Sequence, residues 1–331
     1  MANQEKSLIQ MYVSKLLSNQ IDYLDSQLVG IQQGGSDEFI HHTRVMSRRM
    51  RATIEVFSSY LPKKKAKIWL FHLRNLTRSL TKIRDLDVQI IFLENMISKI
   101  ENQHFIQGVS RVLLRKKQKR DSYNTLANRT VEEFMIAKTN SEIHEFVQAN
   151  HFQDETFYPT QKLSEIAITH IEEGMKNCFS YAPFITNPDN IKQLHNLRIA
   201  FKNLRYSVEL FQDIYPSLTQ FLDIMKQFQD ELGKIHDCDV WLVDLARFGV
   251  KELKKIEAFY GQTGPYNFIK PGLDYLIAEI QLTRNDTYNI FIQHWNEQFQ
   301  RQFWTRLREQ FVQFPAYELI EEQKLELIIP D

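Results

Sequence analysis

Residues 41–57 read HHTRVMSRRMRATIEVF, and this stretch decides the fold. At about 100° per residue, Met46, Met50 and Ile54 fall on one side of a helix. Basic side chains fall on the other side, within an arc of about 80°. They are His41, Arg44, Arg48 and Arg51. One apolar and one basic face predict an amphipathic helix that packs inward and presents cations outward.

The same pattern occurs again 154 residues further along the chain (195 − 41 = 154). Residues 194–211 read LHNLRIAFKNLRYSVELF, with basic positions His195, Arg198, Lys202 and Arg205. A second motif repeats at an offset of 152 (234 − 82 = 152): LTKIRDLDV at 80–88 and LGKIHDCDV at 232–240. A weaker match aligns Lys119 and Tyr123 with Arg284 and Tyr288. Two ordered matches at nearly equal offsets predict a tandem duplication.

Scarce proline and glycine predict long helices. The chain has 10 Gly and 9 Pro in 331 residues, and Pro62 is the only proline in the first 150. Apolar residues recur at spacings of three and four, so the predicted fold class is all-α, with a helical bundle in each half. The first half should contain helices at 5–31, 38–60, 63–82, 85–99 and 102–138. The second should contain them at 161–181, 189–213, 217–233, 237–247 and 251–306, the last interrupted at 261–272.

These spans imply three parts. The first repeat occupies 1–150 and the second 151–310, with a C-terminal accessory tail at 311–331. The N-terminus is too polar for a signal peptide, and no apolar run approaches the about 18 residues of a membrane span. Cys178 and Cys238 lie far apart without metal or redox spacing, which suits a reducing compartment. The expected location is cytoplasmic, without a membrane partner.

Basic charge is concentrated, although 41 basic and 41 acidic residues balance overall. The stretch from His41 to Arg84 holds 12 Lys and Arg but one acid, Glu55 (12 − 1 = +11). Like charges one helical turn apart destabilise a helix, so two copies of such a stripe predict a bound polyanion. Guanidinium groups match phosphate oxygens in pairs, and rows of them suit a repeating phosphate chain.

Further cations extend the stripe. On the next helix of the first half, geometry adds Arg74, Arg78 and Lys82. The second half keeps Lys226 and Lys234 but has Asp230 in place of Arg78, so its share is weaker. Arg115 belongs to a third basic cluster. Aromatic residues do not alternate with these cations in the pattern, which disfavours a nucleic-acid partner.

The motifs Asp85-x-Asp87 and Asp237-x-Asp239 leave several roles open. The first aspartate of each could cap a helix, or could orient nearby arginines. Alternatively, the pairs could hold Mg²⁺ for phosphoryl transfer. Neither His motif has a second ligand at metal spacing, and no catalytic pattern is recognisable, so we expect no metal, no cofactor and no catalytic residue. A neighbouring arginine should keep His41 and His195 neutral until an anion binds.

At the two His-x-x-Arg motifs and the two Lys-Ile-x-Asp motifs, the chain resembles the CHAD family, the conserved histidine α-helical domain. The resemblance implies a stand-alone member, with two four-helix bundles related by a pseudo-two-fold axis around a basic pore or groove. It also implies non-catalytic binding of inorganic polyphosphate, and association with polyphosphate granules. Lys82 and Lys234 join the site through this resemblance. An RNA- or protein-binding scaffold and a Mg²⁺-dependent phosphohydrolase are the alternatives.

Overall fold

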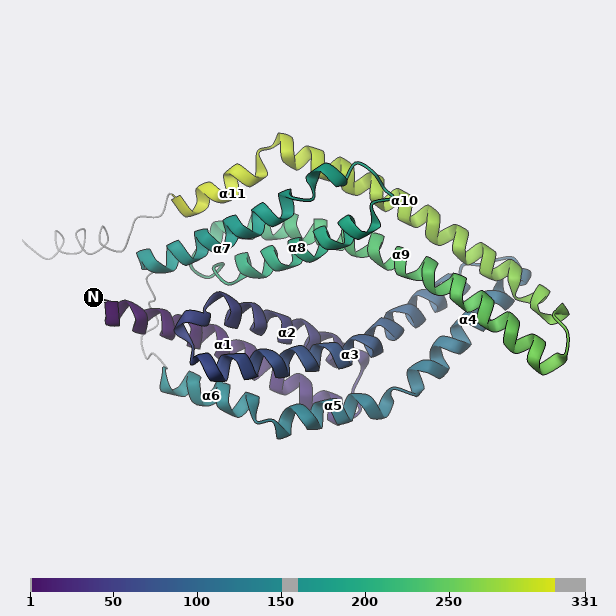
Figure 1. The fold of residues 1–331 in the computed structure, drawn as a ribbon, viewed down its shortest axis with the longest axis horizontal. Coiled ribbons are helices and arrows are strands. Elements are labelled where there is room, and N and C mark those ends of the chain that lie inside the picture. Colours follow the sequence, from purple (N-terminus) through teal and green to yellow (C-terminus); the bar gives the residue numbers. More distant parts are fainter. Residues whose placement is uncertain (1, 151–159, 313–331) are drawn as a thin grey trace, which may run out of the picture.

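The computed structural model describes residues 2–150 and 160–312, and the regular elements in these ranges are all helical (Figure 1). The all-α prediction is confirmed. The first half contains α1 (Ala2–Gln32), α2 (Asp37–Val56), η1 (Ser58–Tyr60), α3 (Lys63–Ile97), α4 (Gln103–Asp121), α5 (Asn124–Ile136) and α6 (Thr139–Ala149). The second contains α7 (Gln161–Phe179), η2 (Ala182–Phe184), α8 (Ile191–Glu209), η3 (Pro216–Leu218), α9 (Thr219–Tyr260), η4 (Gly264–Phe268), α10 (Lys270–Gln300) and α11 (Phe303–Val312).

Two helices are longer than predicted. α3 runs without a break through Asp85, and α9 runs through Asp237, so neither aspartate caps a helix and that prediction is wrong. No proline interrupts either motif, and buried Ile83 and Ile235 keep the helical spacing across it. The predicted helix at 102–138 instead divides into α4 and α5. The predicted interruption after residue 260 is confirmed, because α9 ends at Tyr260 and the next residue, Gly261, has a left-handed φ of 69°.

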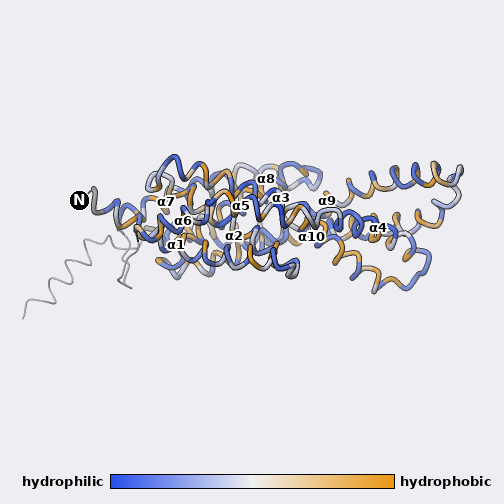
Figure 2. The backbone as a smooth tube through the Cα atoms, turned by 90° about the horizontal axis from the view of Figure 1, so that it is seen from below, coloured by the Kyte–Doolittle hydropathy of each residue, from blue (hydrophilic) through white to orange (hydrophobic). Residues whose placement is uncertain are grey.

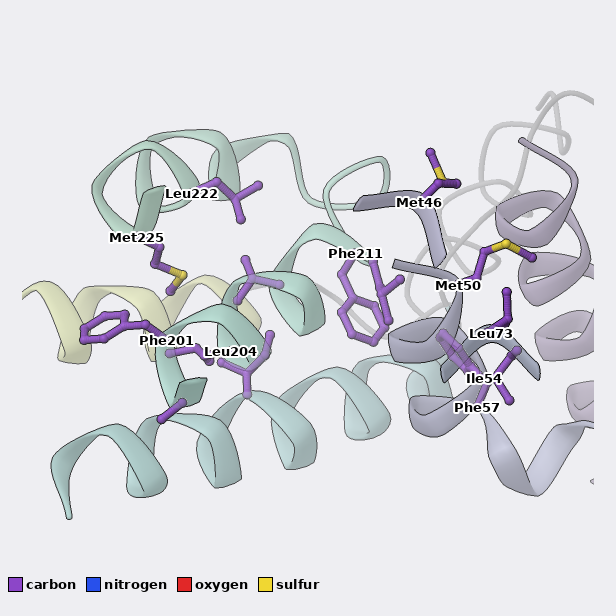
Figure 3. Close-up of a cluster of buried hydrophobic side chains, with 14 of the residues drawn as sticks. Met46, Met50, Ile54, Phe57, Leu73, Phe201, Leu204, Phe211, Leu222 and Met225 are labelled. Atoms are coloured by element: carbon purple, nitrogen blue, oxygen red, sulfur yellow. The ribbon is translucent and has the colours of Figure 1, made fainter. Parts of the chain in front are cut away.

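The main apolar core joins both halves (Figure 3). Met50, Ile54 and Phe57 of the first half are fully buried, as their face of the helix predicts. The rings of Phe57 and Phe211 lie 5.9 Å apart, centroid to centroid, across the contact between the halves. Burying such side chains stabilises the fold by roughly 1.5–3 kcal/mol each. This shared core fixes α2 against α8 and so positions the basic faces of both helices.

A second apolar cluster lies at the other end of the molecule, where α4 and parts of α9 and α10 extend away from the main body (Figure 1). It combines residues of both halves, including Val109, Trp241 and Leu276. The α4 and α10 backbones come so close at Gly108 and Gly272 that a Cβ on either would overlap the other helix. The halves are therefore packed together at two separate places. Hydrophobic and hydrophilic stretches alternate along the helices, as expected of amphipathic segments (Figure 2).

The predicted boundary near residue 150 and the accessory tail at 311–331 fall almost entirely outside the described residues. None of the helices in the described ranges combines the length and the apolarity needed to cross a lipid bilayer.

Candidate polyanion-binding site

The basic faces of α2 and α8 meet where these two helices contact each other. Each helix buries its apolar face, and the opposite face carries the cations at spacings of three and four. Arg49 of α2 donates a hydrogen bond to Glu209 of α8 at 3.1 Å, which helps to hold the contact. The structure therefore brings the two predicted stripes together, from segments about 150 residues apart in the sequence.

Cations of the two halves lie close enough to perturb one another. Burial, together with the positive charges of Arg48 and Arg198, lowers the pKa of Lys202 to about 8. Burial and Arg48 lower the pKa of Arg44 to about 10. These shifts mean that the charged forms are disfavoured in the free protein. A bound anion would reverse that effect.

Several of these cations lack protein partners among the described residues. No described carboxylate lies within ion-pair distance of Arg48, Arg198 or Lys202. The Nε atoms of Arg44, Arg51 and Arg198 are buried and donate to no acceptor in the described part of the chain. A buried donor without an acceptor costs about 1–3 kcal/mol, so this group is suited to an external anion.

The first aspartate of each motif faces this cation group. Asp85 lies 3.8 Å from an Nη atom of Arg44. Burial raises the pKa of Asp85, while Arg44 and Arg48 oppose that shift. Burial also raises the pKa of Asp237, opposed mainly by Arg198. Of the roles left open by the sequence, this geometry favours the orienting of arginines.

The second aspartate of each motif serves a different partner. Asp87 accepts a hydrogen bond from Arg120 at 2.5 Å, and Asp239 accepts one from Arg284 at 2.5 Å. The two aspartates of a motif therefore point to different surroundings. Among the described residues there is no group of three or more side chains that could hold a metal ion. These two ion pairs also correct the repeat alignment, because Arg284 corresponds to Arg120 and not to Lys119.

Each motif histidine lies at one margin of the cation group. Burial and Arg84 lower the pKa of His41, and burial and Arg198 lower that of His195. The Nδ1 atoms of His195 and His236 lie 3.0 Å apart. Burial, Arg198 and His195 lower the pKa of His236 to about 4. The neutral state predicted for both motif histidines at neutral pH agrees with these directions.

Arg84 and His236 were missed by the sequence-based prediction. They occupy the same position of the repeated motif, directly before the first aspartate, and each lies beside the motif histidine of its own half. The two motifs differ at this position, which holds Arg84 in the first and His236 in the second. A comparison of the two motifs could have identified both residues.

A crevice of ≈ 220 Å³ opens beside the contact of α2 and α8. Its walls come from α2, α7 and α8, and combine cations with uncharged hydrogen-bonding groups. The lining residues are Arg48, Arg51, Ala52, Glu55, Val56, His170, Lys202, Asn203, Tyr206 and Ser207. Neither His170 nor the uncharged polar residues of this wall were singled out from the sequence.

Two of the predicted cations, Arg115 and Arg205, contact carboxylates at hydrogen-bond distance. Arg115 donates to the buried carboxylate of Glu252, with Nε at 3.2 Å, on the distal part of α4. Its assignment to the polyanion site is therefore corrected to a structural role, since Glu252 is 2% exposed and needs a cation. Arg205 donates to Gln229 at 2.9 Å and pairs with Glu209 at 2.9 Å, a carboxylate that it shares with Arg49, so it lies beside the site with partners inside the protein.

The remaining predicted cations are exposed on α3 and α9. Arg74 lies 3.8 Å from Glu55. The other exposed cations have no ion pair with any described residue; they are Arg78, Lys82, Lys226 and Lys234. Phe71, three residues before Arg74, is 59% exposed on the same face of α3. The expectation that no aromatic side chain alternates with these cations is wrong at this one position.

Comparison with known proteins agrees with this architecture. The chain is similar to the crystal structure of the CHAD domain from the plant Ricinus communis, with 18% identity and a TM-score of 0.53, over 93% of this chain and 92% of that one. It is also similar to PptA from Streptomyces chartreusis, with 14% identity and a TM-score of 0.58, over 87% of this chain and 99% of that one. No curated protein matches the chain. The family model described as the CHAD domain matches residues 15–246, and the chain therefore belongs to the CHAD domain family.

Proposed function

We propose that this protein binds inorganic polyphosphate, without catalysis, through the basic faces of α2 and α8. The observation that carries the proposal is the group formed by Arg44, Arg48, Arg198 and Lys202, in which cations of both halves lie close together and three of the four have no described ion pair. Such a group is destabilising in isolation and becomes favourable when a polyanion neutralises it.

A linear phosphate chain fits this group better than a small anion does. The cations continue along α3 through Arg78 and Lys82 and along α9 through Lys226 and Lys234, beyond the reach of a single phosphate. Successive helical turns are about 5.4 Å apart, so the charges form rows. In this proposal the two repeats form two four-helix bundles, related by a pseudo-two-fold axis, that hold the chain in a basic groove between them.

The absence of a catalytic role is also part of the proposal. Asp87 and Asp239 are held by Arg120 and Arg284, so the Asp-x-Asp motifs do not supply paired carboxylates to a phosphate. Asp85 instead orients Arg44 beside the expected path of the chain. Incubation of the protein with polyphosphate and Mg²⁺ should leave the chain length unchanged.

The test is a charge reversal at the centre of the site. The double variant Arg48→Glu and Lys202→Glu should weaken polyphosphate binding more than 100-fold in calorimetric titration, while circular dichroism shows unchanged helicity. Lys254→Glu with Lys255→Glu, at exposed positions in the distal part of α9, makes the same change of net charge and should weaken binding less than threefold. Equal losses in the two double variants would contradict the proposal.

Single-stranded RNA is the second candidate ligand, and exposed Phe71 within the basic stripe of α3 is the observation that favours it. Base stacking on an aromatic ring contributes about 1–3 kcal/mol. Competition between RNA and polyphosphate at matched phosphate concentration distinguishes the two ligands. Polyphosphate should displace RNA, and Phe71→Ala should weaken RNA binding alone.

A further inference from the structure

We infer that the crevice beside α2 and α8 recognises the terminal phosphate of a polyphosphate chain, so that the protein discriminates chain ends from chain interiors. This inference rests on the proposed function. It adds a ligand group, the phosphate end, and assigns the crevice residues His170, Asn203 and Ser207 to it.

The first argument is the number of charges and donors around a small volume. The crevice measures ≈ 220 Å³, below the roughly 300–1,000 Å³ of pockets for larger organic ligands. Three cations, Arg48, Arg51 and Lys202, and one carboxylate, that of Glu55, line the crevice, which leaves an excess of two positive charges (3 − 1 = 2). The Nε atom of Arg51 is buried without a described acceptor. Asn203 and Ser207 add uncharged donors from the neighbouring turn of α8.

A terminal phosphate matches this count better than an internal one does. An internal unit of the chain has two non-bridging oxygens and one negative charge. A terminal unit has three such oxygens and, like a phosphate monoester with a second pKa of about 6, carries close to two charges at neutral pH. The third oxygen and the second charge give the additional donors of the crevice a partner.

The second argument comes from the repeat. At the offset of 154, His170 corresponds to Leu16 (170 − 154) and Asn203 corresponds to Arg49 (203 − 154). Leu16 and Arg49 line a separate crevice of ≈ 260 Å³ against α8. Its carboxylate, Glu209, is bound by Arg49 at 3.1 Å and by Arg205 at 2.9 Å.

The two crevices therefore correspond to each other in the repeat but differ in net charge. Three cations and one carboxylate line the first crevice, whereas one arginine and one carboxylate line the second. In the second crevice, the carboxylate of Glu209 pairs with Arg49, which also lines the crevice, and with Arg205, which does not. In the first, Asn203 replaces Arg49, and the corresponding carboxylate of the lining, Glu55 (209 − 154), lies 3.8 Å from Arg74, a residue outside the lining. Arg48 and Lys202 consequently keep their charges available on the side where His170 replaces an apolar leucine.

The test compares two preparations of the same linear polyphosphate in calorimetric titrations at pH 7.5. In one, both ends are free. In the other, both terminal phosphates are converted to phosphoramidates with ethanolamine, which leaves each end with the two oxygens and single charge of an internal unit. Capping should weaken binding to the wild-type protein about tenfold.

Crevice variants then locate the effect. His170→Leu, which installs the residue of the other repeat, and Ser207→Ala should each reduce the preference for free ends to less than threefold. Asn19→Leu, a comparable change in the second crevice, should retain the tenfold preference.

The outcomes separate this inference from the proposed function. Equal binding of capped and free chains to the wild-type protein would overturn the recognition of ends but leave polyphosphate binding intact. A full preference that persists in both His170→Leu and Ser207→Ala would overturn the assignment to this crevice. Failure of either preparation to bind would refute the proposed function itself.

Discussion

Replacing Lys202 by Met should stabilise the free protein, because Lys202 is a cation held among other cations. Methionine keeps most of the aliphatic length of the side chain and removes the charge. The same substitution should weaken polyphosphate binding. A residue whose removal improves stability and impairs binding is expected at a preformed anion site.

The magnitude follows from the pKa of Lys202. Burial, Arg48 and Arg198 lower this pKa from an ordinary 10.5 to about 8. At about 1.4 kcal/mol per pH unit, the charged amine would destabilise the folded state by about 3 kcal/mol. Solvent screening of this partly exposed side chain reduces the expected gain on substitution to about 1–2 kcal/mol.

The pH dependence has a definite sign. A lysine with a lowered pKa destabilises the folded state while it is charged there, below about pH 8. The penalty declines as the pH rises from 8 towards 10.5, where the unfolded chain also loses the proton. Lys202→Met should therefore be more stable than the wild-type protein at pH 7, with little difference near pH 10.5.

Urea denaturation at low salt, at pH 7 and pH 10, measures this difference. Lys254→Met serves as the control, because Lys254 is an exposed cation on the distal part of α9 and its removal should change the free energy of unfolding by less than about 0.5 kcal/mol. If Lys202→Met were no more stable than wild type at pH 7, or gained equally at both pH values, the reasoning would be refuted.

Three further predictions concern other parts of the molecule. Burial and neighbouring positive charge lower the pKa of His195, and they lower the pKa of His236 to about 4. Acidification from pH 6.5 to 4 should therefore destabilise the free protein and strengthen polyphosphate binding. Calorimetry in buffers of different ionisation enthalpy should detect proton uptake on binding. Glu252→Gln should lower the free energy of unfolding by about 2–3 kcal/mol in urea titrations, with less than a twofold change in polyphosphate affinity. Gly108→Ala should lower the free energy of unfolding by about 1–3 kcal/mol, because the added methyl overlaps the backbone at Gly272. This loss should be measured as a lower Tm, and an unchanged Tm would contradict the close packing of α4 on α10.

The helices and their buried faces could be predicted from the sequence, because amphipathic spacing is a local property. Met50, Ile54 and Phe57 are buried, as their positions on the apolar face of the amphipathic helix predict. The continuity of α3 through Asp85 was not predicted, because an aspartate after a basic residue also fits a helix start. In a long helix packed along its length, the tertiary contacts decide between these possibilities.

The cations of the site could be identified from the sequence, but their partners could not. Arg115 and Arg198 look alike in the sequence, yet only Arg115 meets a carboxylate of Glu252, 137 residues away. The crevice was also beyond prediction, because its wall combines His170 of α7 with residues of α2 and α8. Both features depend on how the two repeats pack together, which periodicity within one helix does not determine.

The most direct test of the central claim, that cations of both repeats form one polyanion site, is the salt dependence of polyphosphate binding. If Arg44, Arg48, Arg198 and Lys202 each neutralise one phosphate, the logarithm of the association constant should fall with the logarithm of the salt concentration at a slope of about −2.8 to −3.6. Replacing Arg48 and Arg198, one from each repeat, by Gln should reduce the magnitude of the slope by about 1.5. A slope that is near zero in the wild-type protein, or unchanged in the double variant, would contradict the account.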